Sequence, residues 1–78
     1  MAISDDNIIL QQGEPQDILL GASDSFIVQV TSNAYCRYKV KGGNATTGGI
    51  AKPGIPYAFA SDMTFESDQT VTLYIIRD

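Results

Sequence analysis

Apolar and polar residues alternate along much of this chain. The alternation is clearest over residues 25–31, 35–41 and 70–77. A period of two is typical of a half-buried β-strand, because successive side chains point to opposite faces of a sheet. Val, Ile, Thr, Tyr and Phe dominate these runs, which agrees with strand preferences. No window of eleven or more residues has a helical period, so the pattern predicts an all-β protein.

Turn-forming residues divide the chain into about seven or eight short strands. Gly13-Glu14-Pro15 and Lys52-Pro53-Gly54 fit tight turns, in which Pro presets φ and Gly permits positive φ. The fold expected is a compact antiparallel β-sandwich or a jelly-roll-like barrel, and the pattern does not choose between them. The strands are expected at residues 7–12, 16–20, 25–31, 35–41, 50–51, 57–60, 63–67 and 70–77.

The length allows one domain. With 78 residues the chain has no room for a second, so we expect a flexible N-terminal arm over residues 1–7 and a single β domain over residues 8–78. A domain of this size buries only about 60% of the surface that its unfolded chain exposes. Another protein surface, either a second copy or a partner, is therefore an expected source of extra stability.

The composition excludes several kinds of catalytic and metal site. There is no histidine and a single cysteine, which rules out a histidine-based triad, a zinc finger and an intrachain disulfide. Cys36 alternates with Tyr38 on an apolar face, where a free thiol behaves as a small hydrophobe. Asp62, Glu66 and Asp68 lack the spacing of a calcium loop. We therefore expect no enzymatic activity, no metal and no cofactor.

Charge is unevenly distributed along the chain. The net charge is −4, but residues 1–33, 34–52 and 53–78 carry −5, +4 and −3. In the basic segment Arg37, Lys39 and Lys41 recur at every second position, so they share one strand face with Tyr35. This face has two interpretations: cross-strand complementarity with acidic neighbours, or an interface for an acidic protein. The overall acidity argues against nucleic acid.

The glycine-rich segment Gly42–Gly49 predicts a flexible hairpin loop. A phosphate-binding loop would end in Gly-Lys-Ser/Thr and lead into a helix, and neither is present. The alternative is a contact loop that becomes ordered on a partner, with Asn44, Thr46 and Thr47 as its polar side chains. No secretory signal and no apolar run of membrane-spanning length occurs, so we expect synthesis in a cytoplasm and no membrane contact.

Four segments together resemble small accessory virion proteins of tailed bacteriophages, the capsid decoration or cement proteins. They are residues 8–10, 16–20, 50–57 and 70–77, which resemble the short edge strands, Pro-Gly turns and closing strand of such proteins. The resemblance implies a structural protein that binds the outer surface of a phage capsid and stabilises it across subunit seams. It further implies a virion location and a host-cytoplasm origin. The implied partners are the major capsid protein or another virion protein, and copies of itself, with a trimer favoured.

On this hypothesis the partner interface combines the arm, the basic face and the glycine-rich loop. The alternative function is a small carbohydrate- or ligand-binding β module of a phage fibre or tail, which would use Tyr35, Tyr57 or Tyr74 as exposed rings. The interface residues expected are Ile3, Asp5, Asp6, Tyr35, Arg37, Lys39, Lys41, Asn44, Thr46 and Thr47.

Overall fold

The computed structural model describes residues 4–44 and 48–77. Within these ranges all regular structure is β, and no helix is long and apolar enough to cross a membrane. The strands are β1 (Ser4–Leu10), β2 (Gln16–Ile18), β3 (Phe26–Val30), β4 (Cys36–Val40), β5 (Gly49–Ala51), β6 (Pro56–Phe59), β7 (Met63–Glu66) and β8 (Val71–Arg77).

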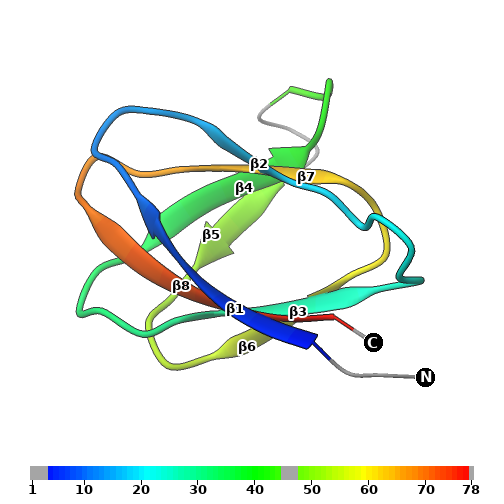
Figure 1. Cartoon of the computed structure of the whole chain (residues 1–78). Coiled ribbons are helices and arrows are strands. Elements are labelled where there is room, and N and C mark those ends of the chain that lie inside the picture. The colour runs from blue at the N-terminus through cyan, green and yellow to red at the C-terminus, as the bar shows by residue number, and fades with distance from the viewer. Residues whose placement is uncertain (1–3, 45–47, 78) are drawn as a thin grey trace.

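The strands form two antiparallel four-stranded sheets that lie face to face (Figure 1). One sheet has the order β1-β8-β3-β6 and the other β2-β7-β4-β5. Successive strands cross between the sheets, except that β4 and β5 are adjacent in one of them. This strand order is that of an eight-stranded jelly roll. The expected all-β fold is therefore confirmed, and the long-range pairing selects the jelly roll over a simpler sandwich.

The first and eighth strands lie side by side. β1 pairs with β8 over seven residue pairs, from Ser4–Arg77 to Leu10–Val71. Of the residues 1–7 expected as a flexible arm, 4–7 lie in this strand, and 1–3 fall outside the described residues. Because β8 also pairs with β3, it is an interior strand of its sheet.

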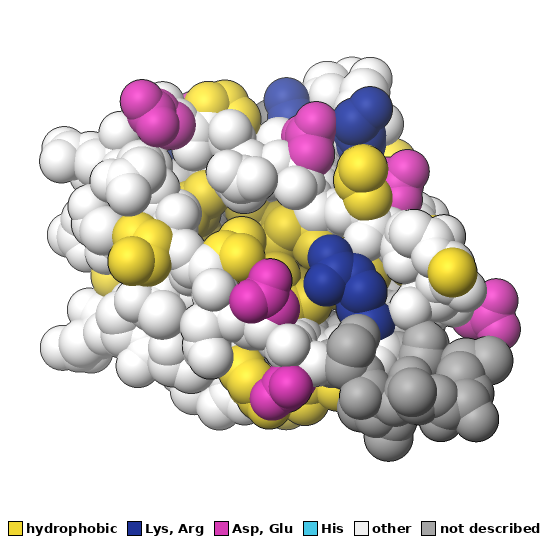
Figure 2. All heavy atoms as spheres, in the orientation of Figure 1, with side chains coloured by type: hydrophobic (Ala, Val, Ile, Leu, Met, Phe, Trp, Pro, Cys, Tyr) yellow, Lys and Arg dark blue, Asp and Glu magenta, His cyan; other side chains and the backbone are white. Residues whose placement is uncertain are grey.

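The inward side chains of both sheets form one apolar core. The alternation read from the sequence holds in β3 and β8, where every second side chain is buried. Figure 2 has the orientation of Figure 1, in which the viewer looks into the space between the two sheets. Apolar side chains lie at the centre of this view, and charged side chains lie around them. The buried apolar residues are Leu10, Ile18, Phe26, Val28, Val30, Cys36, Ala51, Met63, Phe65, Val71, Leu73 and Ile75.

Aromatic rings fill part of the space between the sheets. The Tyr38 ring lies 5.0 Å from that of Phe59 and 6.1 Å from that of Phe65, measured between ring centroids. Phe59 and Phe65 meet edge to face at 5.6 Å, and Phe26 lies 5.6 Å from Phe59. These are favourable geometries for ring pairs. The region where a larger barrel would hold a ligand is here occupied by side chains.

Glycine is required at two positions, for different reasons. Gly54 follows Pro53 with a φ of 79°, which confirms the expected Pro-Gly turn between β5 and β6. Gly48 has a steric role instead, because a Cβ atom there would collide with the carbonyl oxygen of Tyr38. β5 can therefore approach β4 closely at this point only with glycine.

Candidate functional site on the outer face of the β2-β7-β4-β5 sheet

The outward side chains of the β2-β7-β4-β5 sheet are mostly charged or polar. The register places Lys39 beside Thr64, and Arg37 between Glu66 and Ile50. Side chains that are directly opposite in an antiparallel pair lie on the same face, so these groups share one surface. The outward residues of this face are Asp17, Arg37, Lys39, Ile50, Thr64 and Glu66.

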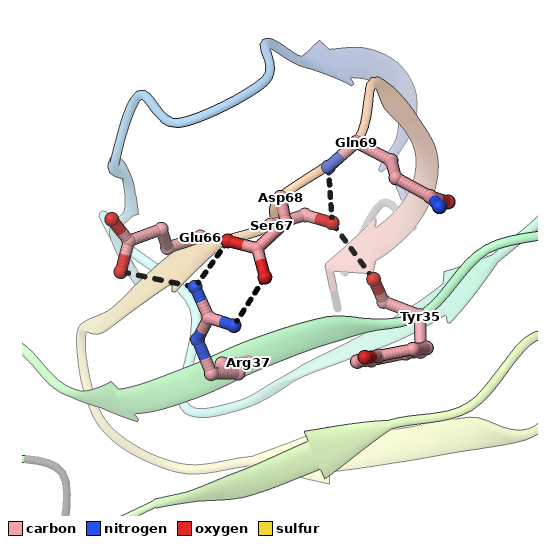
Figure 3. A network of polar contacts seen from close by, with 6 residues as sticks. All are labelled: Tyr35, Arg37, Glu66, Ser67, Asp68 and Gln69. Atoms are coloured by element: carbon pink, nitrogen blue, oxygen red, sulfur yellow. Dashed lines mark hydrogen bonds and ion pairs between the residues drawn. The ribbon is translucent and has the colours of Figure 1, made fainter.

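Arg37 is held by two acidic side chains from the other half of the chain (Figure 3). Its Nη1 and Nη2 atoms donate to Oδ2 and Oδ1 of Asp68 at 3.2 and 3.1 Å, and Nη2 lies 3.8 Å from Oε1 of Glu66. The hydrogen bonds from Arg37, with its positive charge, lower the pKa of the Asp68 carboxyl. For Arg37, the expected complementarity with acidic neighbours is therefore present within the chain itself.

The turn between β7 and β8 is fixed by a second contact to Tyr35, the residue before β4. The Ser67 hydroxyl is buried, donates to the backbone carbonyl of Tyr35 at 2.8 Å and accepts the Gln69 amide hydrogen at 3.2 Å (Figure 3). These bonds leave the Tyr35 ring outside, with the residue 52% exposed. The turn and the start of β4 thus form a fixed frame beside that ring.

The basic residues expected on one face have different environments. Lys39 points outward beside Thr64, whose hydroxyl donates to Asp17 Oδ1 at 2.7 Å. Lys41 follows the end of β4, and its backbone amide donates to the carbonyl of Asp62 at 2.9 Å. Among the described residues Lys39 forms no ion pair. The face therefore offers Lys39, rather than Arg37, as a cation for a partner.

Two surface hollows meet at Ile50 on the edge strand β5. The first has a volume of about 260 Å³ and is lined by β4, β5, β7 and Pro15. The second, of about 580 Å³, is open and mainly apolar, and its lining includes Tyr35, Ile50 and Ile55, which are 52%, 52% and 46% exposed. Its remaining lining residues are Lys52 and Pro53. A partner could therefore contact charged groups and an apolar surface at once.

The other expected interface residues lie elsewhere. Asp5 and Asp6 are in β1, in the opposite sheet. The Asp5 carboxylate accepts a hydrogen bond of 2.8 Å from the Tyr74 hydroxyl, which raises the pKa of Tyr74. Asn44 is exposed in the loop after β4. Ile3, Thr46 and Thr47 lie outside the described residues.

Ile50, Lys52 and Ile55 line the second hollow but were not among the interface residues predicted from the sequence. One signal was available, because Ile50 and Ile55 flank a Pro-Gly turn in segments too short to bury them. Tyr57, considered as an exposed ring, instead packs against Tyr38 at 6.0 Å, and its hydroxyl accepts the Lys52 backbone amide hydrogen at 3.1 Å.

The single thiol is buried in the core on the inward side of β4. Burial raises the pKa of Cys36 to about 11, although the nearby Arg37 charge opposes this shift. The group is therefore a neutral thiol near pH 7, where a nucleophile would need a thiolate. Among the described residues, no three His, Cys, Asp or Glu side chains form a group that could hold a metal ion.

Comparisons with known proteins identify the fold. The sequence matches no family model and no curated protein. A similar solved structure is the crystal structure of the Cupin_2 domain of an XRE-family transcriptional regulator from Enterobacter cloacae, with a TM-score of 0.73 and 16% sequence identity. The match covers 95% of this chain and 78% of that one. At this identity the likeness concerns the fold, so the chain is a small cupin-like jelly roll.

This finding corrects the resemblance to phage decoration proteins. The structural neighbour is a regulator domain and not a virion protein. The capsid-binding function, the fibre or tail alternative and the virion location are therefore wrong. The physical reason is that short edge strands, Pro-Gly turns and a closing β-strand are shared by jelly rolls in general. They identify an architecture and carry no information on a particular family.

Proposed function

We propose that this chain is a non-enzymatic binding module that takes an extended, acidic and apolar segment of a partner protein along the edge strand β5. The observation that carries the proposal is the exposed apolar hollow beside β5, with Ile50 at its junction with the charged face. The use of a similar fold in a transcriptional regulator is in keeping with a role in binding.

The apolar part of the site supplies the attraction for a partner. Tyr35, Ile50 and Ile55 are each about half exposed, and all three line the same hollow. Contiguous apolar surface rimmed by polar groups is characteristic of interaction sites, whereas scattered exposed apolar residues need no explanation. A branched apolar side chain of the partner would remove these residues from water, and that burial favours binding.

Two lysines give the site its preference for acidic partners. Lys39 lines the first hollow and Lys52 the second, and neither forms an ion pair within the described part of the chain. They belong to the basic segment 34–52 of an otherwise acidic chain. Charges at the rim of an interface select the partner and speed the encounter more than they add affinity.

The position of β5 suits an extended segment. It is the outermost strand of its sheet and pairs with β4 on one side. Edge strands can receive a further strand, with backbone hydrogen bonds for affinity and alternate side chains for specificity. Ile50 faces outward between the inward Gly49 and Ala51, so an added strand would contact the hollows with every second side chain.

The proposal is tested with a fluorescein-labelled peptide of alternating Glu and Val residues. We expect binding in fluorescence anisotropy, and much weaker binding of the matched peptide in which Lys replaces Glu. Ile50→Ser should weaken binding by about tenfold or more, because it removes a buried apolar side chain from the complex. Lys39→Glu with Lys52→Glu should reverse the preference between the two peptides.

Ile9→Ser is the matched control, because Ile9 is 59% exposed on the opposite sheet. This variant should bind the acidic peptide as the parent does. Equal binding of both peptides, no binding of either, or an unchanged affinity in Ile50→Ser would each refute the proposal.

A further inference from the structure

We propose that the outer face of the β1-β8-β3-β6 sheet is the interface of a homodimer, in which a second copy packs against it face to face. This inference concerns the sheet opposite the β5 site and does not depend on the proposed peptide binding. It rests on the chemistry, the charge and the size of that face.

The face has an apolar centre. Ile27 is 40% exposed, and it lies between Ile76 of β8 and Ala58 of β6. At the edge, Ile9 of β1 is 59% exposed. The outward residues of the four strands that the structure describes are Asp5, Asn7, Ile9, Ile27, Gln29, Pro56, Ala58, Thr72, Tyr74 and Ile76.

The near absence of charge on this face favours a second copy over another partner. Among its described outward residues, Asp5 alone has a formal charge, and its carboxylate accepts a hydrogen bond from the Tyr74 hydroxyl. Among the described outward residues, an acidic partner would find no cation here, and a basic partner would find one carboxylate. Two copies of a chain with net charge −4 repel each other, and contact through the least charged face brings the fewest like charges together.

The size of the face sets the strength of the dimer. Four strands about 4.8 Å apart and about five residues long give a flat footprint of roughly 320 Å². Before side-chain relief is added, this footprint is less than half of the approximately 800 Å² per partner of a standard interface. The single core already holds each protomer together. We therefore infer a reversible dimer rather than an obligate one.

A single self-complementary face fits a dimer rather than a trimer. A two-fold axis brings the same patch of both copies together, whereas a closed trimer needs two different complementary patches. The middle of this face lies between β8 and β3, where Gln29 is opposite Tyr74 and Ile27 is opposite Ile76. Near a two-fold axis each of these residues would lie close to its own counterpart.

Sedimentation equilibrium tests the dimer, with samples from about 10 μM to about 1 mM. The average mass should rise from the 8.4 kDa of one chain towards twice that value. Ile27→Lys should weaken association by at least about tenfold, because two added cations would meet near the axis. Gln29→Lys alters a position that is already polar on the same face, so it should have the same effect without disturbing the fold.

Ile50→Lys is the matched control on the opposite sheet, and it should leave the dimer intact. Circular dichroism checks that each variant is folded. The proposal is overturned if the parent protein stays monomeric at about 1 mM, or if its mass converges on three chains. It is equally overturned if the two substitutions on the apolar face leave association unchanged, or if Ile50→Lys abolishes it.

Discussion

The outer face of the β2-β7-β4-β5 sheet carries Asp17, Arg37, Lys39 and Glu66, whereas Asp5 alone is charged among the described outward residues of the β1-β8-β3-β6 sheet. Both sheets have the same number of strands and the same alternation, and their inward side chains share one core. The difference between the sheets therefore lies in their outward side chains, which do not pack in the core.

The comparison separates the positions that make the fold from those that give it a function. Inward residues must be apolar and complementary in shape, because they pack in one interior. Outward residues need only suit a strand, so one face can carry several charges that are partly paired within the chain, while the other has an apolar centre and a single charge among its described residues. The differing surfaces imply two kinds of contact: a salt-sensitive one at β5 and an apolar one on the opposite sheet.

The largest expected effect comes from breaking the shared core. Phe65→Ala removes a fully buried ring that packs against Phe59 and Tyr38, so the free energy of unfolding should fall by about 3–5 kcal/mol. Ile9→Ser, on an outer face, should change it by less than about 0.5 kcal/mol. Urea unfolding measures both. A loss below about 1 kcal/mol for Phe65→Ala would contradict the assignment of one core to both sheets.

An alkaline titration tests the inner side of the charged sheet. Burial raises the pKa of Cys36 from 9.0 to about 11, so the unfolded chain loses this proton at lower pH than the folded one. The stabilisation is complete below about pH 9, and it is lost as the pH rises towards 11, up to about 2–3 kcal/mol in all. Urea unfolding across this range should show the decline.

Cys36→Ala is the control for this titration. Without the thiol, the decline between pH 9 and 11 should become shallower. The same slope in the variant and the parent would show that Cys36 does not titrate differently on folding.

Contacts at the two surfaces should differ in their dependence on salt concentration. Raising NaCl from about 50 to about 500 mM shortens the screening length more than threefold, so binding of the acidic peptide at β5 should weaken several-fold. Association through the apolar sheet should be unchanged or slightly stronger, because screening reduces repulsion between two copies of an acidic chain. Anisotropy and sedimentation at both concentrations measure this. If both affinities changed equally with salt, the proposed difference between a charged and an apolar contact would be wrong.

The smallest expected effect concerns the Arg37–Asp68 pair. Asp68→Asn should lower the melting temperature slightly at pH 7, since both side chains are exposed and such pairs stabilise little. The pKa of Asp68 is lowered by its hydrogen bonds to Arg37, so this contribution is present at neutral pH and is lost on acidification through that pKa. Parent and variant should therefore melt alike in strong acid. A difference in melting temperature between parent and variant that persists in strong acid would show that the ion pair does not explain the effect of the substitution.

The strands were predictable from the sequence, but their order was not. The alternation in residues 70–77 identifies a half-buried strand, and Val71, Leu73 and Ile75 are indeed buried. The same alternation suits a sandwich and a jelly roll equally, because it is a local property. The strand order depends on pairs between distant segments, such as β1 with β8, which no local pattern specifies.

The candidate site was predictable only in part. The period of two correctly placed Arg37 and Lys39 on one strand face. It could not show that Asp68, 31 residues further along, would engage Arg37. The apolar hollow was missed because Ile50 and Ile55 lie in short segments, where exposure depends on what packs above them.

The pairing of β1 with β8 has a consequence for the order of folding. β8 lies between β1 and β3, so neither of these strands has its main neighbour until residues 71–77 have been synthesised. An emerging chain that lacks β8 presents two open strand edges and an incomplete core. The domain should therefore fold only once residues 71–77 are available, and slowly for its length, because contacts between distant segments must form before the chain is stabilised.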